Sequence, residues 1–268
     1  MSMIYCKLKG GLANMLFQIA GTLGISKKYG MSPSFPNLNQ NLNYLNQDDF
    51  YNSKLKHAEE YKLILGKINQ IPPKSHHLKY IHYPFHYVEI PLNDEDCSIE
   101  GFFQSEKYFI NAKSEIFELF KEPLIVQKII NEKYPQYSVR TTSLHVRRGD
   151  YLKLPNYHPT QPISYYEQAM NILKDETDYF LVFSDDIEWC KENIIGNNII
   201  YIDNEIDYIE LYLMARCDNN IIANSSFSWW GAWLNKNENK KVVSPNLWFG
   251  CDVGENTNDI IPENWIKI

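Results

Sequence analysis

The sequence predicts an α/β protein in which a parallel β-sheet carries helices on both faces. Two observations predict this class: short apolar strand patterns alternate with helical patterns beyond residue 138, and the chain begins with a strand, a glycine turn and a helix. Strands that are buried on both faces read as continuous apolar runs, as they do here. We expect an N-terminal α/β domain at 1–137 and a C-terminal nucleotide-binding α/β domain at 138–268.

The first half opens with a strand expected at 3–8, which Gly10-Gly11 separates from an amphipathic helix at 14–29. Gly30 stands where a C-cap glycine would end that helix. The weak periodicity of 31–70 predicts no definite element. The other expected elements of this half are a strand ending near residue 101 and two helices separated by a proline, at 111–120 and 124–133.

The second half alternates more regularly between the two kinds of pattern. Its expected strands lie at 143–147, 179–184, 199–202, 220–223 and 241–244. Its expected helices lie between them, at 163–173, 187–192, 208–216 and 229–234. Ligands of open α/β sheets gather at the carboxyl ends of the strands, so polar residues that follow these strands are the candidates for a site.

Composition and charge narrow the classes of function. With 268 residues, of which 44% are hydrophobic, the chain is long enough to bury a sizeable core. Its 26 basic and 33 acidic residues give a net charge of -7, which argues against nucleic acid or anionic lipid as a general partner. Any anion site must therefore be local.

Cysteine spacing and hydropathy indicate a reduced, cytoplasmic protein. The five cysteines are far apart and form no CxxC or Cys/His pattern. No apolar run of about 20 residues and no signal-peptide pattern occurs. The aromatic stretch 80–87 could contact a membrane surface, although packing in the core is the usual role of such rings. Its histidines lack the spacing of a zinc site, and no feature indicates an oligomeric state.

Segment 144–151 carries the clearest chemical signal, two adjacent guanidinium groups after an apolar strand. Arginine keeps its proton at cellular pH and its rigid donor fork matches phosphate oxygens, so Arg147 and Arg148 could hold a diphosphate without a metal. The alternative is an ion-paired surface turn. His145, inside the same strand, could contact the diphosphate or be a hydrogen-bonded core histidine.

Two more polar clusters follow expected strands. In Asn224-Ser225-Ser226-Phe227, free backbone N–H groups at a helix start could bind an anion, or the serine could simply cap the helix. The tryptophans that follow are expected in the core. Ser184-Asp185-Asp186 could hold a metal with substrate phosphates, but we favour Asp185 as an acceptor for a base or ribose and Asp186 as a helix cap.

The glycine turn near the N-terminus is a weaker signal. It is not GxGxxG and lacks the lysine of a Walker A loop. Gly11 would let backbone approach a ligand, and Asn14 could cap the helix or point its amide toward a phosphate or sugar.

Several segments together resemble the α-1,2-fucosyltransferase family, the inverting GDP-fucose enzymes of glycosyltransferase family 11. They occur in the family's order and reach from residue 10 to residue 235. The segments are 10–18 (GGLANMLFQ), 101–109 (GFFQSEKYF), 145–151 (HVRRGDY), 183–189 (FSDDIEW), and 213–217 (LMARC) running on to Trp233. The arginine motif occurs in several fucosyltransferase families, whereas its combination with 224–233 is specific.

The resemblance implies a GT-B fold, with two Rossmann-like domains facing a cleft. GDP-fucose would be held mainly by the C-terminal domain, and the N-terminal domain would form the acceptor side. The implied activity is that of an inverting galactoside α-1,2-fucosyltransferase without a metal or other cofactor. The alternatives are a GDP-fucose transferase with another acceptor or linkage, and a non-catalytic nucleotide-sugar or glycan-binding module.

The resemblance also suggests roles for residues. Arg147 would contact the β-phosphate and carry the catalytic role. Asp150 and His158 are the candidates for a general base, and Asp150 could equally anchor an arginine or contact the nucleoside. The expected donor contacts are Gly11, Asn14, His145, Arg147, Arg148, Ser184, Asp185, Asn224, Ser225, Ser226 and Phe227. Ala13, Met15 and Glu210 differ from the family's usual residues.

Overall fold

The computed structural model describes residues 1–47, 57–74, 77–81, 84–134, 139–254 and 256–268. The chain forms two compact units. Unit 1 is Met1–Pro123 with Glu255–Pro262, and unit 2 is Leu124–Gly254 with Glu263–Ile268. Each unit contains a sheet whose described strands pair in parallel, so the predicted α/β class is confirmed.

Unit 1 holds a sheet in the order β2-β1-β4-β3. Its strands are β1 (Met3–Cys6), β2 (Ser32–Ser34), β3 (Leu78–Ile81) and β4 (Cys97–Glu100). Its helices are α1 (Leu12–Tyr29), α2 (Leu38–Gln47), α3 (Lys62–Leu65) and α4 (Lys113–Leu119), with 3₁₀ turns at Ala58–Tyr61, Glu106–Tyr108 and Ile110–Ala112. Helix α1 ends as expected at Gly30, whose φ of 65° lies in the left-handed region that glycine favours.

Helix α1 packs closely against the segment that follows β4, because two of its residues have no side chain. A Cβ on Gly24 would lie 2.1 Å from the carbonyl oxygen of Tyr108, and one on Gly21 would lie 2.6 Å from the Cβ of Phe103. Both distances are far below van der Waals contact, so only glycine permits this approach. The contact holds residues 103–111 firmly on α1.

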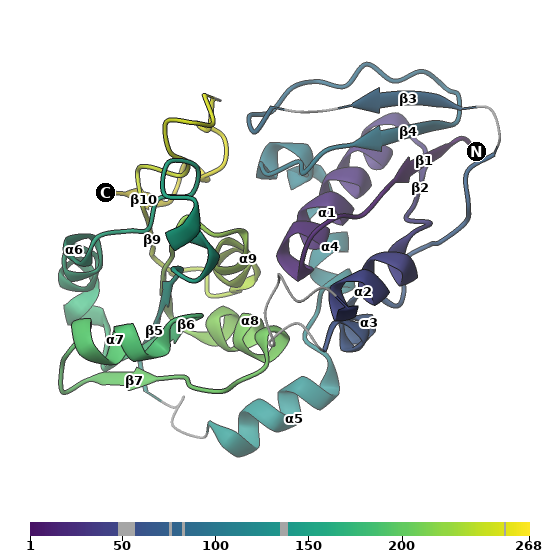
Figure 1. Ribbon diagram of the computed structural model, residues 1–268. Helices are drawn as coiled ribbons and strands as arrows, with labels where there is room; N and C mark the ends of the chain where they lie inside the picture. Colours follow the sequence, from purple (N-terminus) through teal and green to yellow (C-terminus); the bar gives the residue numbers. More distant parts are fainter. Residues whose placement is uncertain (48–56, 75–76, 82–83, 135–138, 255) are drawn as a thin grey trace. The chain divides into compact units, whose positions relative to one another are not determined.

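Unit 2 holds a sheet in the order β10-β9-β8-β5-β6-β7. Its strands are β5 (Thr141–Val146), β6 (Tyr179–Ser184), β7 (Ile199–Tyr201), β8 (Asn219–Ile221), β9 (Val242–Ser244) and β10 (Ile266–Lys267). Its helices are α5 (Leu124–Lys133), α6 (Ile163–Leu173), α7 (Ile187–Asn193), α8 (Asp207–Arg216) and α9 (Ser226–Leu234), with 3₁₀ turns at Asp150–Lys153 and Lys174–Glu176. Helices α6 and α7 lie on one side of this sheet and α8 and α9 on the other (Figure 1).

The strand order of unit 2 reverses beside β5. From β5 the chain proceeds through β6 to β7, and it then returns to β8 on the other side of β5 and continues to β9. In open α/β sheets such a reversal opens a crevice at the carboxyl ends of the two diverging strands. The segments that follow β5 and β8 are therefore the place to look for a ligand site.

Most of the predicted strands and helices are confirmed, and the differences have local causes. Helix α9 begins at Ser226 rather than at 229, because the hydroxyl of Ser225 accepts a hydrogen bond from the N–H of Phe227 and caps its first turn. Strand β5 ends at Val146, so Arg147 lies in the loop. The helix expected at 111–120 is a 3₁₀ turn followed by α4.

Burial agrees with the core expected from the sequence. Trp229 and Trp230 are fully buried and Trp233 is 4% exposed, so these rings belong to the core and are not a sugar platform. Four cysteines are buried, and Cys251 is exposed. None of the helices within the described residues is both long and apolar enough to cross a membrane.

Candidate functional site

The two arginines that follow β5 are paired with carboxylates. Nη2 of Arg147 donates to Oδ1 of Asp150 at 2.6 Å, and Nη1 lies 3.2 Å from Oδ2 of Asp185. The backbone N–H of Arg148 donates to Oδ1 of Asp185 at 2.9 Å, and its Nε donates to Oδ2 of Asp186 at 2.9 Å. These charge-assisted bonds join the loop after β5 to the loop after β6.

Gly149 makes this network possible. A Cβ at this position would lie 2.5 Å from Oδ2 of Asp185, too close for two nonbonded atoms. Any other residue would push the carboxylate of Asp185 away from Arg147. The glycine within the arginine motif is therefore needed for the close approach of the two loops.

Aromatic rings also hold the guanidinium groups. The guanidinium carbon of Arg147 lies 5.4 Å from the ring centroid of Tyr151, and that of Arg148 lies 4.0 Å from the ring of Trp189, both within the range of a cation–π contact. The side chain of Arg147 is 33% exposed and that of Arg148 is 18% exposed. Arg147 is therefore the arginine better placed to present N–H donors to a ligand.

The acidic loop after β6 is ordered by its own contacts. Oδ1 of Asp186 accepts the N–H of Trp189 at 3.4 Å, which makes Asp186 the predicted cap of α7. The backbone N–H of Asp186 donates to the hydroxyl of Ser184 at 2.9 Å. Ser184 is 3% exposed, so it shapes the loop from inside.

Asn224, at the end of β8, is only 2% exposed and its side chain is used within the protein. Its Nδ2 donates to the carbonyl oxygens of Pro159 at 3.0 Å and Trp248 at 2.9 Å. Its Oδ1 accepts from Nε2 of Gln161 at 3.0 Å. The side-chain amide of Asn224 thus connects three segments of unit 2. Within this loop, donors for a ligand would have to come from the residues after Asn224.

Those residues form the start of α9. Ser226 and Phe227 are partly exposed beside the capping Ser225. The first turn of a helix leaves backbone N–H groups without intrahelical partners, and the helix dipole favours an anion there. The ring of Phe227 lies 5.7 Å from the ring of His145, a β5 residue that is 4% exposed, so His145 packs against the start of α9.

Tyr151 connects the loops after β5 and β8, and sequence reasoning did not single it out. Its hydroxyl donates to the backbone carbonyl of Asn224 at 2.9 Å, while its ring lies beside the guanidinium of Arg147. The same ring stacks on His158, with centroids 4.5 Å apart and planes at 12°. The position of Tyr151 within the arginine motif 145–151 is the sequence feature that could have identified it. Tyr151 holds Arg147 and the start of α9 in one arrangement.

His158 lies in an aromatic surrounding made by Tyr151, Tyr157 and Phe249. Burial lowers the pKa of His158, Asp150 acts in the opposite direction, and the cation of Arg147 adds to the lowering. The imidazole is therefore neutral at pH 7 and able to accept a proton.

The predicted site residues of unit 1 lie at the start of α1. Gly11 is the N-cap, so Asn14 stands within the first turn and its Oδ1 accepts from Nε2 of Gln104 at 3.3 Å. This bond joins the two N-terminal motifs. Met15 is fully buried, and its sulfur lies 3.2 Å from Nδ2 of Asn41, so this departure from the family pattern is a core residue. The other predicted site residues belong to unit 2.

Comparison with known proteins shows which family the chain belongs to. The family model described as glycosyl transferase family 11 matches residues 79–268. The O-antigen biosynthesis glycosyltransferase WbnK of Escherichia coli is 31% identical over 99% of this chain and 100% of its own length. An α-1,2-colitosyltransferase of Escherichia coli is 32% identical over 100% of this chain and 99% of its own length.

A solved structure with a similar fold is that of NodZ, an α-1,6-fucosyltransferase soaked with GDP-fucose. NodZ, which comes from Bradyrhizobium, aligns with a TM-score of 0.53 and 11% identity over 92% of this chain and 95% of NodZ. At this identity the likeness concerns the fold alone. It confirms the predicted GT-B type.

Proposed function

We propose, since the chain belongs to glycosyl transferase family 11, that it transfers L-fucose from GDP-β-L-fucose to a glycan hydroxyl with inversion. The expected product carries an α-1,2 linkage to a terminal galactose. The observation that carries the proposal is that Arg147 and the capped start of α9 follow the two strands that flank the reversal of the sheet. Paired arginine and helix-start donors are what a diphosphate requires.

In the proposed reaction an acceptor hydroxyl attacks C1 of fucose from the face opposite GDP, and the C1–O bond to the β-phosphate breaks. Negative charge then builds on that phosphate. Arg147 would stabilise this charge, and the backbone N–H groups of Ser226 and Phe227 would contact the diphosphate. Removing one preorganised donor of this kind lowers the rate by about 10²–10³. The hydroxyl proton would pass to His158 or to solvent.

We propose that Asp150 regulates the access of a phosphate to Arg147 and that Asp185 anchors the guanidinium of Arg147. Oδ1 of Asp150 accepts from Nη2 of Arg147 at 2.6 Å. This ion pair supports a role of Asp150 as a partner of the arginine rather than as general base or nucleoside contact. Asp185 is also bonded to the backbone of Arg148. His145, Arg148 and Ser184 would complete the donor side by holding these loops.

Transfer is proposed to need no metal or other cofactor. Arg147 and Arg148 supply positive charge, and the carboxylates of Asp185 and Asp186 already accept from them. Treatment with EDTA should leave the rate unchanged. A loss of activity that added Mg²⁺ or Mn²⁺ restores would contradict this part of the proposal.

The family resemblance supports further assignments. Unit 2 would hold the donor and unit 1 would form the acceptor side, with Gly11 and Asn14 contributing donor contacts from unit 1. The scattered cysteines support a cytoplasmic site of reaction.

A second candidate donor is GDP-colitose, since one relative of similar identity is an α-1,2-colitosyltransferase. Colitose is fucose without the hydroxyl at C3, so the two donors differ by one hydrogen-bonding group. A site built to bond that hydroxyl rejects the deoxy sugar strongly, by about 10⁴-fold in favourable cases. The ratio of kcat/KM for the two donors therefore decides between them.

The test is transfer by the purified protein from each donor to a panel of glycans with different terminal sugars, with linkage analysis of the products. Arg147→Ala should lower kcat by about 10²–10³ without changing the circular dichroism spectrum. Arg140→Ala, which removes an arginine paired with Asp178 on the surface, is the matched control and should keep the rate. Wild-type transfer by Arg147→Ala would refute the proposal, and donor binding without transfer would favour a non-catalytic module.

A further inference from the structure

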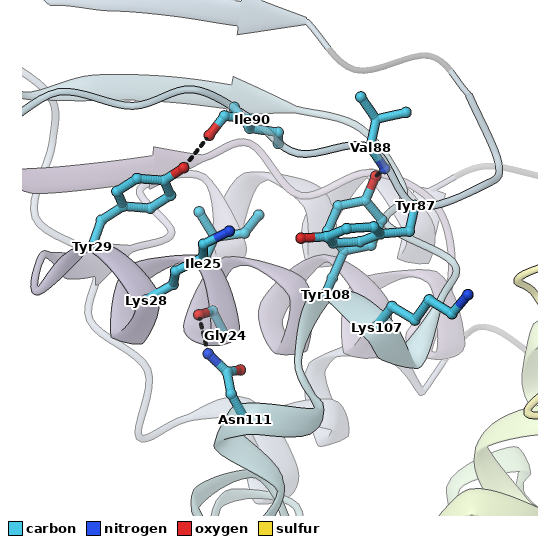
Figure 2. Close-up of a pocket in the computed structure, with 10 residues that line it drawn as sticks. All are labelled: Gly24, Ile25, Lys28, Tyr29, Tyr87, Val88, Ile90, Lys107, Tyr108 and Asn111. Atoms are coloured by element: carbon cyan, nitrogen blue, oxygen red, sulfur yellow. Dashed lines mark hydrogen bonds between the residues drawn. The ribbon is translucent and has the colours of Figure 1, made fainter.

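Unit 1 carries a pocket that the proposed transfer step does not use. It lies between the second half of α1, the segment 87–90 and the segment 107–111 (Figure 2). Its cavity volume is ≈ 200 Å³. Pockets for drug-sized ligands measure about 300–1,000 Å³, so this one suits a single ring.

Tyrosine side chains form the walls of this pocket, and hydrogen bonds hold two of them, Tyr29 and Tyr108. The rings of Tyr87 and Tyr108 are 4.8 Å apart, with planes at 53°. The hydroxyl of Tyr108 accepts from the N–H of Val88 at 2.8 Å. The hydroxyl of Tyr29 donates to the carbonyl oxygen of Ile90 at 2.7 Å. Tyr29 and Tyr108 are therefore fixed before any ligand binds, and Tyr87 packs against the fixed ring of Tyr108.

The floor of the pocket is equally rigid. Nδ2 of Asn111 donates to the carbonyl oxygen of Gly24 at 2.9 Å (Figure 2). The missing Cβ of Gly24 lets the backbone of Tyr108 touch α1. A preformed pocket loses little conformational entropy when it binds a small ligand, so less of the binding free energy is offset.

The charges around the pocket are balanced. Nζ of Lys28 lies 2.8 Å from Glu89, and Nζ of Lys107 lies 2.6 Å from Asp259. The other carboxylate oxygen of Asp259 accepts the N–H of Tyr87 at 3.0 Å. Because each ammonium has a carboxylate partner, the pocket offers no excess positive charge to a phosphate or a carboxylate. It favours an uncharged ligand that can form hydrogen bonds.

Tyr87 offers the open contact. Its side chain is partly exposed, and within the described residues its hydroxyl has no hydrogen-bond partner. Figure 2 shows this hydroxyl directed to the side of the pocket where Tyr29 and Lys28 lie. A tyrosine ring with a free hydroxyl packs against the C–H face of a pyranose and bonds its hydroxyl groups.

We propose that this pocket binds one neutral pyranose ring of the acceptor glycan, at a distance from the sugar that receives the transferred residue. The identity of this ligand rests on the proposed function. Asn14 and Gly24 stand ten residues apart on α1, which separates them by about 15 Å along the helix at ~1.5 Å per residue. The pocket is thus a sugar site of unit 1 that lies far from Asn14, the residue of α1 proposed to contact the donor.

Binding can be measured without the transfer reaction. The protein is labelled with 3-fluorotyrosine, saturated with GDP, and titrated with methyl β-D-galactopyranoside, methyl α-D-glucopyranoside and methyl N-acetyl-β-D-glucosaminide. At least one glycoside should shift the ¹⁹F signal that Tyr87→Phe removes, with a dissociation constant in the millimolar range typical of small ligands. If none of the three shifts that signal, the proposal fails.

Variants locate the site and separate it from the active centre. Tyr87→Ala should weaken the affinity for the glycoside roughly tenfold, as loss of an aromatic contact does. Tyr179→Ala, at a tyrosine of unit 2 that is 39% exposed, is the matched control and should bind as the wild type does. For transfer, Tyr87→Ala should raise KM for an oligosaccharide acceptor while leaving kcat, and KM for a single galactoside, unchanged.

The two proposals fail in different ways. If the wild type transfers no fucose but the Tyr87 signal still responds to a glycoside, the transfer proposal fails and the sugar site stands. If the wild type transfers fucose while Tyr87→Ala binds glycosides and uses the oligosaccharide as the wild type does, only the sugar site is refuted.

Discussion

Replacing Asp150 with asparagine tests how Arg147 becomes available to a phosphate. The Asp150 side chain is 38% exposed, whereas that of Asp185, the other carboxylate beside Arg147, is 12% exposed. Asp185 is therefore the buried anchor, and Asp150 occupies a solvent-facing donor position of the guanidinium that a phosphate oxygen would take. We expect the carboxylate of Asp150 to compete with GDP for Arg147.

The size of the effect follows from the exposure of the pair. Ion pairs that are this exposed contribute about 0.3–1 kcal/mol, because water screens them. Since 1.4 kcal/mol corresponds to a factor of ten, Asp150→Asn should raise the affinity for GDP by about 2–5-fold. If Asp150 were instead the general base, the affinity would stay the same and kcat would fall by about 10²–10⁴.

Isothermal titration calorimetry with GDP, at low and at moderate salt, measures the first quantity, and initial rates measure the second. Asp175→Asn, at an exposed carboxylate of unit 2 that follows α6 and is not among the partners of Arg147 or Arg148, is the matched control and should change neither. The reasoning is refuted if Asp150→Asn weakens GDP binding, or if it lowers kcat more than a hundredfold at unchanged affinity.

Four other substitutions, one of them a control, test local contacts. Tyr151→Phe removes the hydrogen bond to the Asn224 carbonyl. It should lower the free energy of unfolding, measured in urea, by about 1–2 kcal/mol and weaken GDP binding. Unchanged GDP binding would mean that this hydrogen bond does not couple the two loops. Gly24→Ala should destabilise the protein by about 1–3 kcal/mol through the contact with Tyr108. Gly11→Ala, whose Cβ meets nothing within 4 Å, should cost less than about 1 kcal/mol, the loss expected when alanine replaces glycine at a helix N-cap. Burial would raise the pKa of Glu205, but hydrogen bonds from Lys133 and Tyr134 outweigh it and hold that pKa below the usual 4.5. The stability that Glu205 contributes is thus complete above pH 4.5 and is lost as the pH falls through the lower folded pKa, and Glu205→Gln should flatten acid unfolding in that range.

The sequence predicts those elements whose residues repeat with a clear period. Helix α1 and the alternation from β5 to β9 were predictable because apolar residues face a core at regular spacing. Helix α2 lies in an Asn-rich stretch of low hydropathy, and β2 and β10 are too short to show alternation. These elements are stabilised by packing against neighbouring elements, so no local sequence pattern predicts them.

The same limit applies to the candidate site. That Arg147, Arg148 and Asp185 would meet was predictable, because parallel strands end at one edge of a sheet. Which side chains face a ligand was not. The amide of Asn224 is used by residues far away in sequence, and Asn14 bonds to Gln104 instead of capping α1. Such partners are decided by how loops from different elements pack, which residue spacing does not encode.

The division of the chain bears on how it is made. Residues 256–262 return to unit 1, where Asp259 pairs with Lys107, and β10 then adds an outer strand to the sheet of unit 2. Each unit is therefore completed by residues that the ribosome adds after Gly254. Neither unit therefore has its full set of native contacts until the segment after Gly254 has been synthesised. The same short segment thus supplies the last contacts of both units, so completion of the two units is coupled through it.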